Sequence, residues 1–289
     1  MLARIDGGGV VAHDAVLQEI RGLDPLKDHQ RIAFLTSLQE FPWDTTRSLE
    51  LALFRAFAVA KGTALLAGTG EFTERTQKRY DDTVLLLAEI LEHGYDSVRG
   101  KAALRRINQM HGRYPIPHDE FLYVLSTFVF EPIRWNERFG WRPLLRKEKL
   151  ASFYFWREIA RRMAIRDVPE DYETFERYYD EFPIQNYRYA PENGALARAT
   201  RDLLLGWYLP KPLWRLGRPF VHAMMDDHLL EAVGLPRPHP AVRRLTEGGV
   251  RFRSRIVRRL PPRRKPRLIT RQRHPTYPKG YTIEELGVR

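Results

Sequence analysis

Apolar residues recur at every third or fourth position through most of the chain, the pattern of helices with one buried face. Few segments alternate between apolar and polar residues as a half-buried strand would. We therefore predict an all-α fold, a single mainly helical domain of globin-like size. The predicted helices cover residues 45–60, 72–92, 98–111, 120–130, 147–163, 169–181, 193–206, 217–231 and 239–247.

Residues that cap or end helices mark several of these boundaries. Asp44, Ser97 and Asp119 precede apolar runs and can accept hydrogen bonds from amides of the first turn. Gly94 follows a predicted helix and can end it. The stretch AKGTALLAGTG carries three glycines. It matches no dinucleotide- or phosphate-binding loop, so we expect it to break the preceding helix.

The positive charge of the chain is concentrated near its C-terminus. The net charge is +12, yet residues 237–289 alone hold 16 Lys and Arg against 3 Glu. We divide the chain into an N-terminal segment packed on the body (1–40), a helical domain (41–250) and an irregular basic extension rich in Pro and Arg (251–289). The extension is predicted to be extended and to wrap on the body or on a partner.

The composition also excludes some classes of protein. The absence of cysteine excludes disulfides, thiolate metal sites and a cysteine nucleophile. The first residues, MLARIDGGGVVAHDAV, lack the apolar core of a signal peptide, and no apolar run of about 18 residues predicts a spanning helix. We therefore expect a cytoplasmic protein. Residues 203–225 mix Trp, Tyr, Leu and Arg, which suits either a membrane-interface segment or two packed helix ends.

Two neighbouring predicted helices carry polar residues on otherwise apolar faces. His111 ends one helix on the stripe of Leu104 and Ile107, whereas Arg79 and Thr83 lie one turn apart on the aliphatic face of the other. A buried guanidinium needs an anion, either a carboxylate from a neighbouring helix or an anionic group of a ligand. A neutral imidazole in an apolar pocket is either a core histidine or a ligand of haem iron.

Other polar residues leave further alternatives. Glu131 lies between an apolar helix end and a proline, and we expect it to pair with an arginine, Arg79 being one candidate. His111 could instead act as the general base of a helical hydrolase or lyase, which requires a neighbouring carboxylate or nucleophile. The chain contains no HExxH, GxSxG or paired CxxC motif.

Four segments of the chain resemble the MpaB/rubber-oxygenase (latex clearing protein) family, and particularly its MpaB-like branch. They are RTQKRYDDT, RRINQMHGRY, YVLSTFVFEPIRWNERFGWRP and HPTYPKGYTIEELG. The resemblance runs from about residue 40 to the C-terminus and is strongest over 71–182. It implies that residues 41–250 are a helical oxygenase domain that binds haem b without a covalent bond. It also implies a reaction of dioxygen with a lipophilic substrate, with cleavage of a carbon–carbon double bond.

Individual positions carry over from this resemblance. It implies that His111 is the metal ligand on the proximal side of the haem, and that Arg79 and Thr83 are cofactor-binding and catalytic residues beside it. Two positions depart from the rubber-cleaving branch, because Asp82 replaces a lysine and Leu125 replaces a second histidine. These departures favour a smaller isoprenoid- or polyketide-like substrate over rubber.

A second class of function rests on the basic extension alone. The chain could be a non-enzymatic helical protein that binds an anionic membrane or nucleic acid through residues 251–289. The extension forms no recognised nucleic-acid-binding module, so nucleic acid is disfavoured. Peripheral contact with an anionic membrane would also suit an enzyme with a lipophilic substrate, and we expect it in either class.

Overall fold

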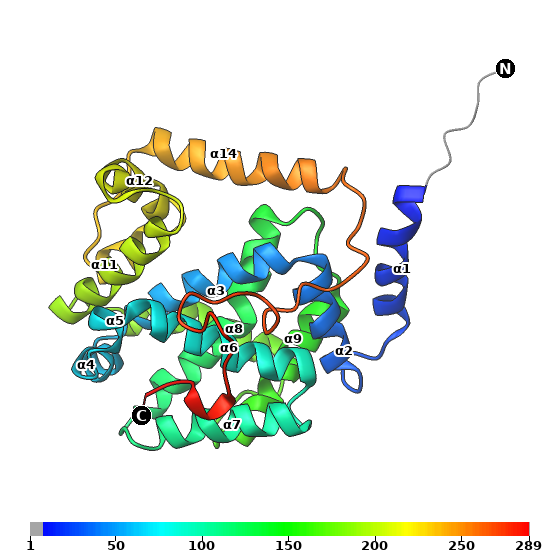
Figure 1. Cartoon of the computed structure of the whole chain (residues 1–289), viewed down its shortest axis with the longest axis horizontal. Coiled ribbons are helices and arrows are strands. Elements are labelled where there is room, and N and C mark those ends of the chain that lie inside the picture. Colours follow the sequence, from blue (N-terminus) through cyan, green and yellow to red (C-terminus); the bar gives the residue numbers. More distant parts are fainter. Residues whose placement is uncertain (1–7, 289) are drawn as a thin grey trace.

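A computed structural model of the protein describes residues 8–288, with side chains from residue 15 onward. Across these residues the chain forms helices and no β-strand, with one isolated bridge between His274 and Tyr277 (Figure 1). The all-α prediction is therefore confirmed. Residues 1–7, which begin the segment examined for a signal peptide, lie outside the described part of the chain.

The helices follow one another with short connections. In chain order they are α1 (Gly8–Gly22), α2 (His29–Phe34), π-helical η1 (Leu35–Glu40), α3 (Pro42–Ala56), α4 (Ala60–Gly68), α5 (Glu71–Glu74), α6 (Thr76–His93), α7 (Val98–His111), α8 (His118–Phe139), α9 (Arg146–Arg162), α10 (Tyr172–Asn186), α11 (Pro191–Gly206), 3₁₀-helical η2 (Lys211–Leu213), α12 (Trp214–His222), α13 (Asp227–Ala232), α14 (Pro240–Val257) and 3₁₀-helical η3 (Ile283–Glu285).

The main core forms around α8, which packs against α3, α9 and α10. Its largest fully buried side chains are aromatic and include Tyr123, Phe130, Phe153 and Phe175. Each such side chain contributes roughly 1.5–3 kcal/mol through removal of apolar surface from water. This burial explains why α8 continues through Pro132, where a helix loses a hydrogen bond at a cost of about 3 kcal/mol.

A second core lies between α6, α7, α9 and the C-terminal segment. Leu85, Ala103 and Leu286 are fully buried in it. Leu286 belongs to residues 267–288, which we call the C-terminal strap, and this segment crosses α6 and α7 (Figure 1). The strap is mostly irregular and wraps on the body, as the sequence led us to expect.

Several helix boundaries differ from the predicted ones. The helix expected at 217–231 is divided into α12 and α13, because Asp226 caps α13 by accepting from the Leu229 amide at 2.8 Å. The helix expected at 239–247 continues to Val257, so the start of the predicted extension 251–289 is helical. Arginine has a high helix propensity, and the apparent alternation in VRFRSRIVRRL is compatible with one exposed helical stripe.

Three predictions about helix ends were wrong in their details. The glycine-rich stretch 60–70 forms α4 and the break precedes it, since α3 ends at Ala56. Asp44 does not cap α3, because the helix begins at Pro42 and the Asp44 carboxylate is buried in its first turn. Asp119 likewise lies inside α8, whose N-cap is Pro117.

The segment 203–225 consists of the end of α11, the turn at Pro210, η2 and α12, and thus of packed helix ends with a turn. None of the described helices alone is long and apolar enough to span a bilayer. Only α3 and α4 taken together reach that length and composition, and they are bent by 98° relative to each other.

Candidate functional site

Arg79 on α6 and His111 on α7 lie at about the same distance from the turn that joins these two helices. Gly94, at a φ of 82°, ends α6, and the Ser97 hydroxyl caps α7 by accepting from the Gly100 amide at 2.9 Å. Arg79 lies 15 residues before Gly94, and His111 lies 14 residues after Ser97. At 1.5 Å per residue, both side chains are therefore about 22 Å from the turn, on helices that pack against each other.

His111 presents a buried and unpartnered ring nitrogen. Its Nδ1 atom is inaccessible to solvent and has no hydrogen-bond partner among the described residues. The ring contacts Phe121 edge-on, with centroids 5.1 Å apart. Burial, and then the positive charge of Arg79, lower the pKa of His111 to about 4. At neutral pH the imidazole is thus uncharged, with one nitrogen lone pair available to a ligand.

Arg79 is held within α6 without an ion pair. Its Nη1 donates to the Thr83 hydroxyl, which itself donates to the Arg79 carbonyl at 2.9 Å. The guanidinium carbon lies 4.9 Å from the centre of the Phe72 ring. No carboxylate of the described chain lies within 4 Å of the guanidinium, and burial lowers the pKa of Arg79. More distant charges on Asp82 and Glu71 act in the opposite direction and leave this cation only partly compensated.

The Thr83 hydroxyl is therefore already committed to Arg79. A hydroxyl carries one proton, and that of Thr83 is used by the backbone carbonyl of Arg79. It cannot donate to a bound molecule without breaking this bond, so its geometry suits the orientation of the guanidinium.

Glu131 pairs with an arginine, as the sequence predicted, but the candidate Arg79 is not that partner. Glu131 pairs with Arg55 and not with Arg79, and it also accepts from the Tyr179 hydroxyl. Arg55 additionally bonds Asp226 at 3.0 Å. This buried network adjoins a small cavity of about 40 Å³. Met224 and Met225 also line this cavity.

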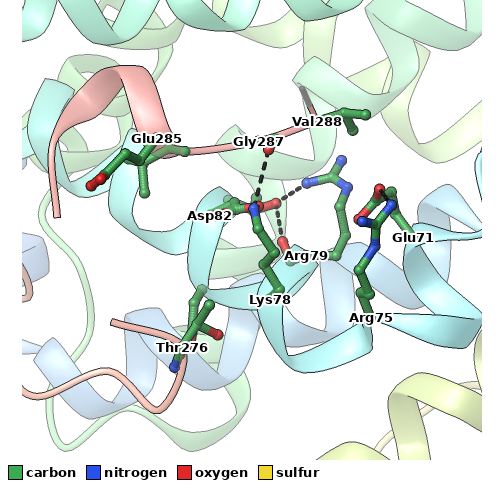
Figure 2. Close-up of polar contacts among 12 residues, drawn as sticks. Glu71, Arg75, Lys78, Arg79, Asp82, Thr276, Glu285, Gly287 and Val288 are labelled. Atoms are coloured by element: carbon green, nitrogen blue, oxygen red, sulfur yellow. Dashed lines mark hydrogen bonds and ion pairs between the residues drawn. The ribbon is translucent and has the colours of Figure 1, made fainter. Parts of the chain in front are cut away.

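Asp82, whose role the sequence left open, anchors the C-terminal strap. Its carboxylate accepts from Lys78 Nζ at 2.7 Å and from the Tyr277 hydroxyl at 2.5 Å. Lys78 also donates to the Gly287 carbonyl at 3.1 Å, so one lysine joins α6 to the strap. Figure 2 shows Lys78, Asp82 and Arg79 on α6 with Gly287 and Val288 of the strap beside them.

The strap also contacts α7 next to His111. Arg106 donates to the carbonyls of Leu286 and Val288 at 2.7 and 2.9 Å. A Cβ atom on Gly287 would lie only 2.0 Å from Met110 Sδ, one residue before His111. The position of this segment was not predictable from the sequence, because contacts between residues so far apart in the chain leave no periodic signal.

The site at His111 offers a single imidazole and not a cluster of metal-ligating side chains. Among residues 8–288, no group of three or more His, Asp or Glu side chains could hold a bare metal ion. A larger cavity of about 510 Å³ lies between the strap and the end of α6, where His93, Arg99 and Tyr281 line it. His111, Arg79 and Thr83 line neither this cavity nor the small one beside Arg55.

Comparison with known proteins gives this chain clear relatives. A family described as "ER-bound oxygenase mpaB/B'/Rubber oxygenase, catalytic domain" matches residues 45–259. ER-bound oxygenase mpaB' of Penicillium brevicompactum is 30% identical over 243 residues, which make up 78% of this chain and 57% of that protein. ER-bound oxygenase mpaB of Penicillium roqueforti is 29% identical over 216 residues, 68% of this chain and 72% of that protein.

The chain thus spans little more than half the length of the first of these relatives. Among solved structures, that of latex clearing protein in the closed state is similar to this chain over 88% of its residues and 75% of the other chain. The TM-score is 0.44 and the sequence identity 14%.

Proposed function

Since the chain belongs to the family of ER-bound oxygenase mpaB/B' and rubber-oxygenase catalytic domains, we propose that it is a haem b-dependent oxygenase. Its substrates would be dioxygen and a lipophilic molecule, isoprenoid- or polyketide-like, with cleavage of a carbon–carbon double bond as the expected reaction. The relatives' names support an oxygenase, and the residues around His111 support the haem.

The observation that carries this proposal is the pairing of a neutral imidazole that has no hydrogen-bond partner at Nδ1 with a buried cation that is only partly compensated. His111 Nδ1 is buried without a hydrogen bond, which a group that coordinates a metal would satisfy. The Arg79 guanidinium is only partly compensated and lies at about the same distance from the α6–α7 turn as His111. It would pair with a propionate. One haem molecule supplies both the metal and the anion, so these two residues fit it.

The residues would then have distinct parts. His111 would hold the iron, Arg79 a propionate, and Thr83 would orient Arg79. When bound, haem b supplies an iron centre that activates dioxygen. In metal-binding histidines the ring nitrogen that does not bind the metal usually donates to a carbonyl or carboxylate. In this structure Nδ1 has no acceptor, so Nδ1 itself is a candidate ligating atom.

The hydrolase or lyase alternative finds less support. A general base works best when its pKa lies near the working pH, whereas the pKa of His111 is lowered to about 4. The ring also lacks the orienting carboxylate that such a base requires.

Membrane association belongs to the same proposal. The relatives are named ER-bound, and a lipophilic substrate resides in or near a bilayer. We predicted a cytoplasmic protein in peripheral contact with an anionic membrane through residues 251–289. The cytoplasmic location stays a prediction.

The proposal is tested by oxygen uptake of the haem-loaded protein with isoprenoid olefins of increasing chain length. We expect uptake with at least one olefin, together with carbonyl products, and none with His111→Ala. Equal uptake by the two proteins would contradict the assignment of His111.

A further inference from the structure

Exposed apolar side chains are gathered in one part of the protein. Of the twelve large hydrophobic side chains exposed in the described chain, eight lie between residues 208 and 260. Six of them form two stripes on neighbouring helices, and we call them the α12–α14 surface. They are Leu213, Leu216, Phe220, Leu245, Phe252 and Ile256, each between 42% and 69% exposed.

The stripe on α14 points away from the body. Leu245, Phe252 and Ile256 are spaced i, i+7 and i+11 and therefore share one helix face. Ser254, half a turn away from that face, is buried, and its hydroxyl donates to the Phe139 carbonyl of α8. Gly248 lies within the stripe, and a Cβ atom there would meet nothing within 4 Å. The outer face of α14 is thus open.

The stripe on α12 continues this surface, since α12 contacts α14. Leu213, Leu216 and Phe220 are spaced i, i+3 and i+7. Gly217 lets α12 approach Leu205 and Leu209 closely, because a Cβ atom there would lie 2.7 Å from each of them. Close contact with Leu205 and Leu209 therefore fixes α12 at Gly217. Leu216 and Phe220 of α12, and Leu213 at the end of η2, stay exposed.

The charges around both stripes are positive. The four acidic side chains between residues 208 and 260 all lie in ion pairs with arginines. Several exposed cations of the same region have no ion pair within the described part of the chain. They are Lys211, Arg215, Arg244, Arg255, Arg258 and Arg259. Apolar side chains flanked by unpaired arginines are complementary to the interface of an anionic bilayer, where the charges meet lipid phosphates.

We propose that the α12–α14 surface docks on an anionic membrane, with its apolar side chains inserted at the headgroup boundary. This inference refines the membrane association within the proposed function, but it does not depend on haem. It also shifts the predicted contact from the strap to α12 and α14, and only the start of the segment 251–289 remains part of it. The strap residues beyond 267 are bonded to α6 and α7, whereas the outer faces of α12 and α14 are available.

The test is co-sedimentation of the full chain with vesicles of phosphatidylcholine, with and without phosphatidylserine. We expect binding to the anionic vesicles that weakens with salt. The double variant Phe252→Ser/Ile256→Ser should bind roughly tenfold more weakly, because it loses two inserting side chains. The matched control is Ile184→Ser/Tyr189→Ser, which removes two other exposed apolar side chains, away from this surface, and should bind as the native chain does.

Each other outcome overturns the proposal. Native binding by the Phe252→Ser/Ile256→Ser variant, or equal loss in the control, would exclude this surface as the contact. A variant that changes from dimer to monomer in sedimentation velocity, with vesicle binding unaltered, would assign the surface to a second copy of the chain. Haem absorbance is recorded on the same samples, so failure to bind vesicles and failure to bind haem are distinguished.

Discussion

The positive charge of Arg79 on α6 acts on His111 at the end of α7, and together with burial it lowers the pKa of that imidazole to about 4. A buried cation beside a neutral base is an unfavourable arrangement for the protein alone. It becomes favourable when an anion and a metal ion enter together.

Replacement of Arg79 shows whether this arginine binds a ligand or stabilises the fold. Arg79→Met should leave the free energy of unfolding of the haem-free protein within about 1 kcal/mol of the native value, since no ion pair is lost. Haem retention should fall. Arg55→Met is the matched control, because Arg55 pairs with Glu131 and Asp226. It should cost about 3–5 kcal/mol in urea unfolding. A similar loss in Arg79→Met would mean that this arginine is structural.

Thr83 is predicted to act through Arg79. Thr83→Val removes the hydroxyl that accepts from Arg79 and donates to its carbonyl. Haem should dissociate faster from this variant, while the position of the absorbance maximum stays the same because the iron ligand is unchanged. Thr83→Ser keeps the hydroxyl and should restore native retention. If serine fails to restore it, the methyl group and not the hydrogen bond is what matters.

The strap should stabilise the α6–α7 hairpin, and with it the proposed haem site. Gly287→Ala places a methyl group against Met110 at a φ of 84°, which only glycine adopts readily. Gly280→Ala is the control, because its φ is 97° but nothing lies within 4 Å of the added Cβ atom. Both variants should lose about 1–2 kcal/mol of folding free energy from the backbone. Only Gly287→Ala should lose more and also bind haem less tightly; equal losses would contradict the contact with Met110.

His222 should contribute folding stability that rises with pH between about 4 and 6.5. Its Nδ1 donates to the Pro236 carbonyl at 3.0 Å, and burial with nearby Arg201 lowers its pKa to about 4. The unfolded chain, with an ordinary pKa of 6.5, therefore binds the proton more readily than the folded one. This costs roughly 3 kcal/mol of folding free energy as pH falls through the whole window.

The check is urea unfolding of native protein and His222→Gln at pH 5 and pH 7. Proton binding by His222 on unfolding should lower the free energy of unfolding of the native protein at pH 5 relative to pH 7. This loss between pH 7 and pH 5 should be smaller in His222→Gln, because the variant lacks the imidazole that binds a proton on unfolding. Glu50, whose pKa is raised to about 7 by burial, has the opposite dependence and is common to both proteins. An identical pH dependence would show that His222 does not titrate as described.

The sequence predicted those parts of the site that depend on local signals. Ser97 and Gly94 fix the ends of α6 and α7, and with the helix lengths they place Arg79 and His111 at similar distances from the turn between the two helices. The partner of Glu131 was not predictable, because which arginine it meets depends on how α3 packs on α8. The contacts of Asp82 with Tyr277 were missed for a related reason. They join residues almost 200 positions apart, in a segment without helical periodicity.

The central claim is that His111 binds haem iron, and an absorption spectrum tests it most directly. The protein is purified from cells supplied with haem precursor, and its spectrum is recorded before and after dithionite and carbon monoxide. We predict a Soret band that shifts with both reagents and that is lost in His111→Ala, while helicity by circular dichroism is unchanged. A featureless visible spectrum that stays so after hemin is added, or a normal Soret band in His111→Ala, would contradict the account.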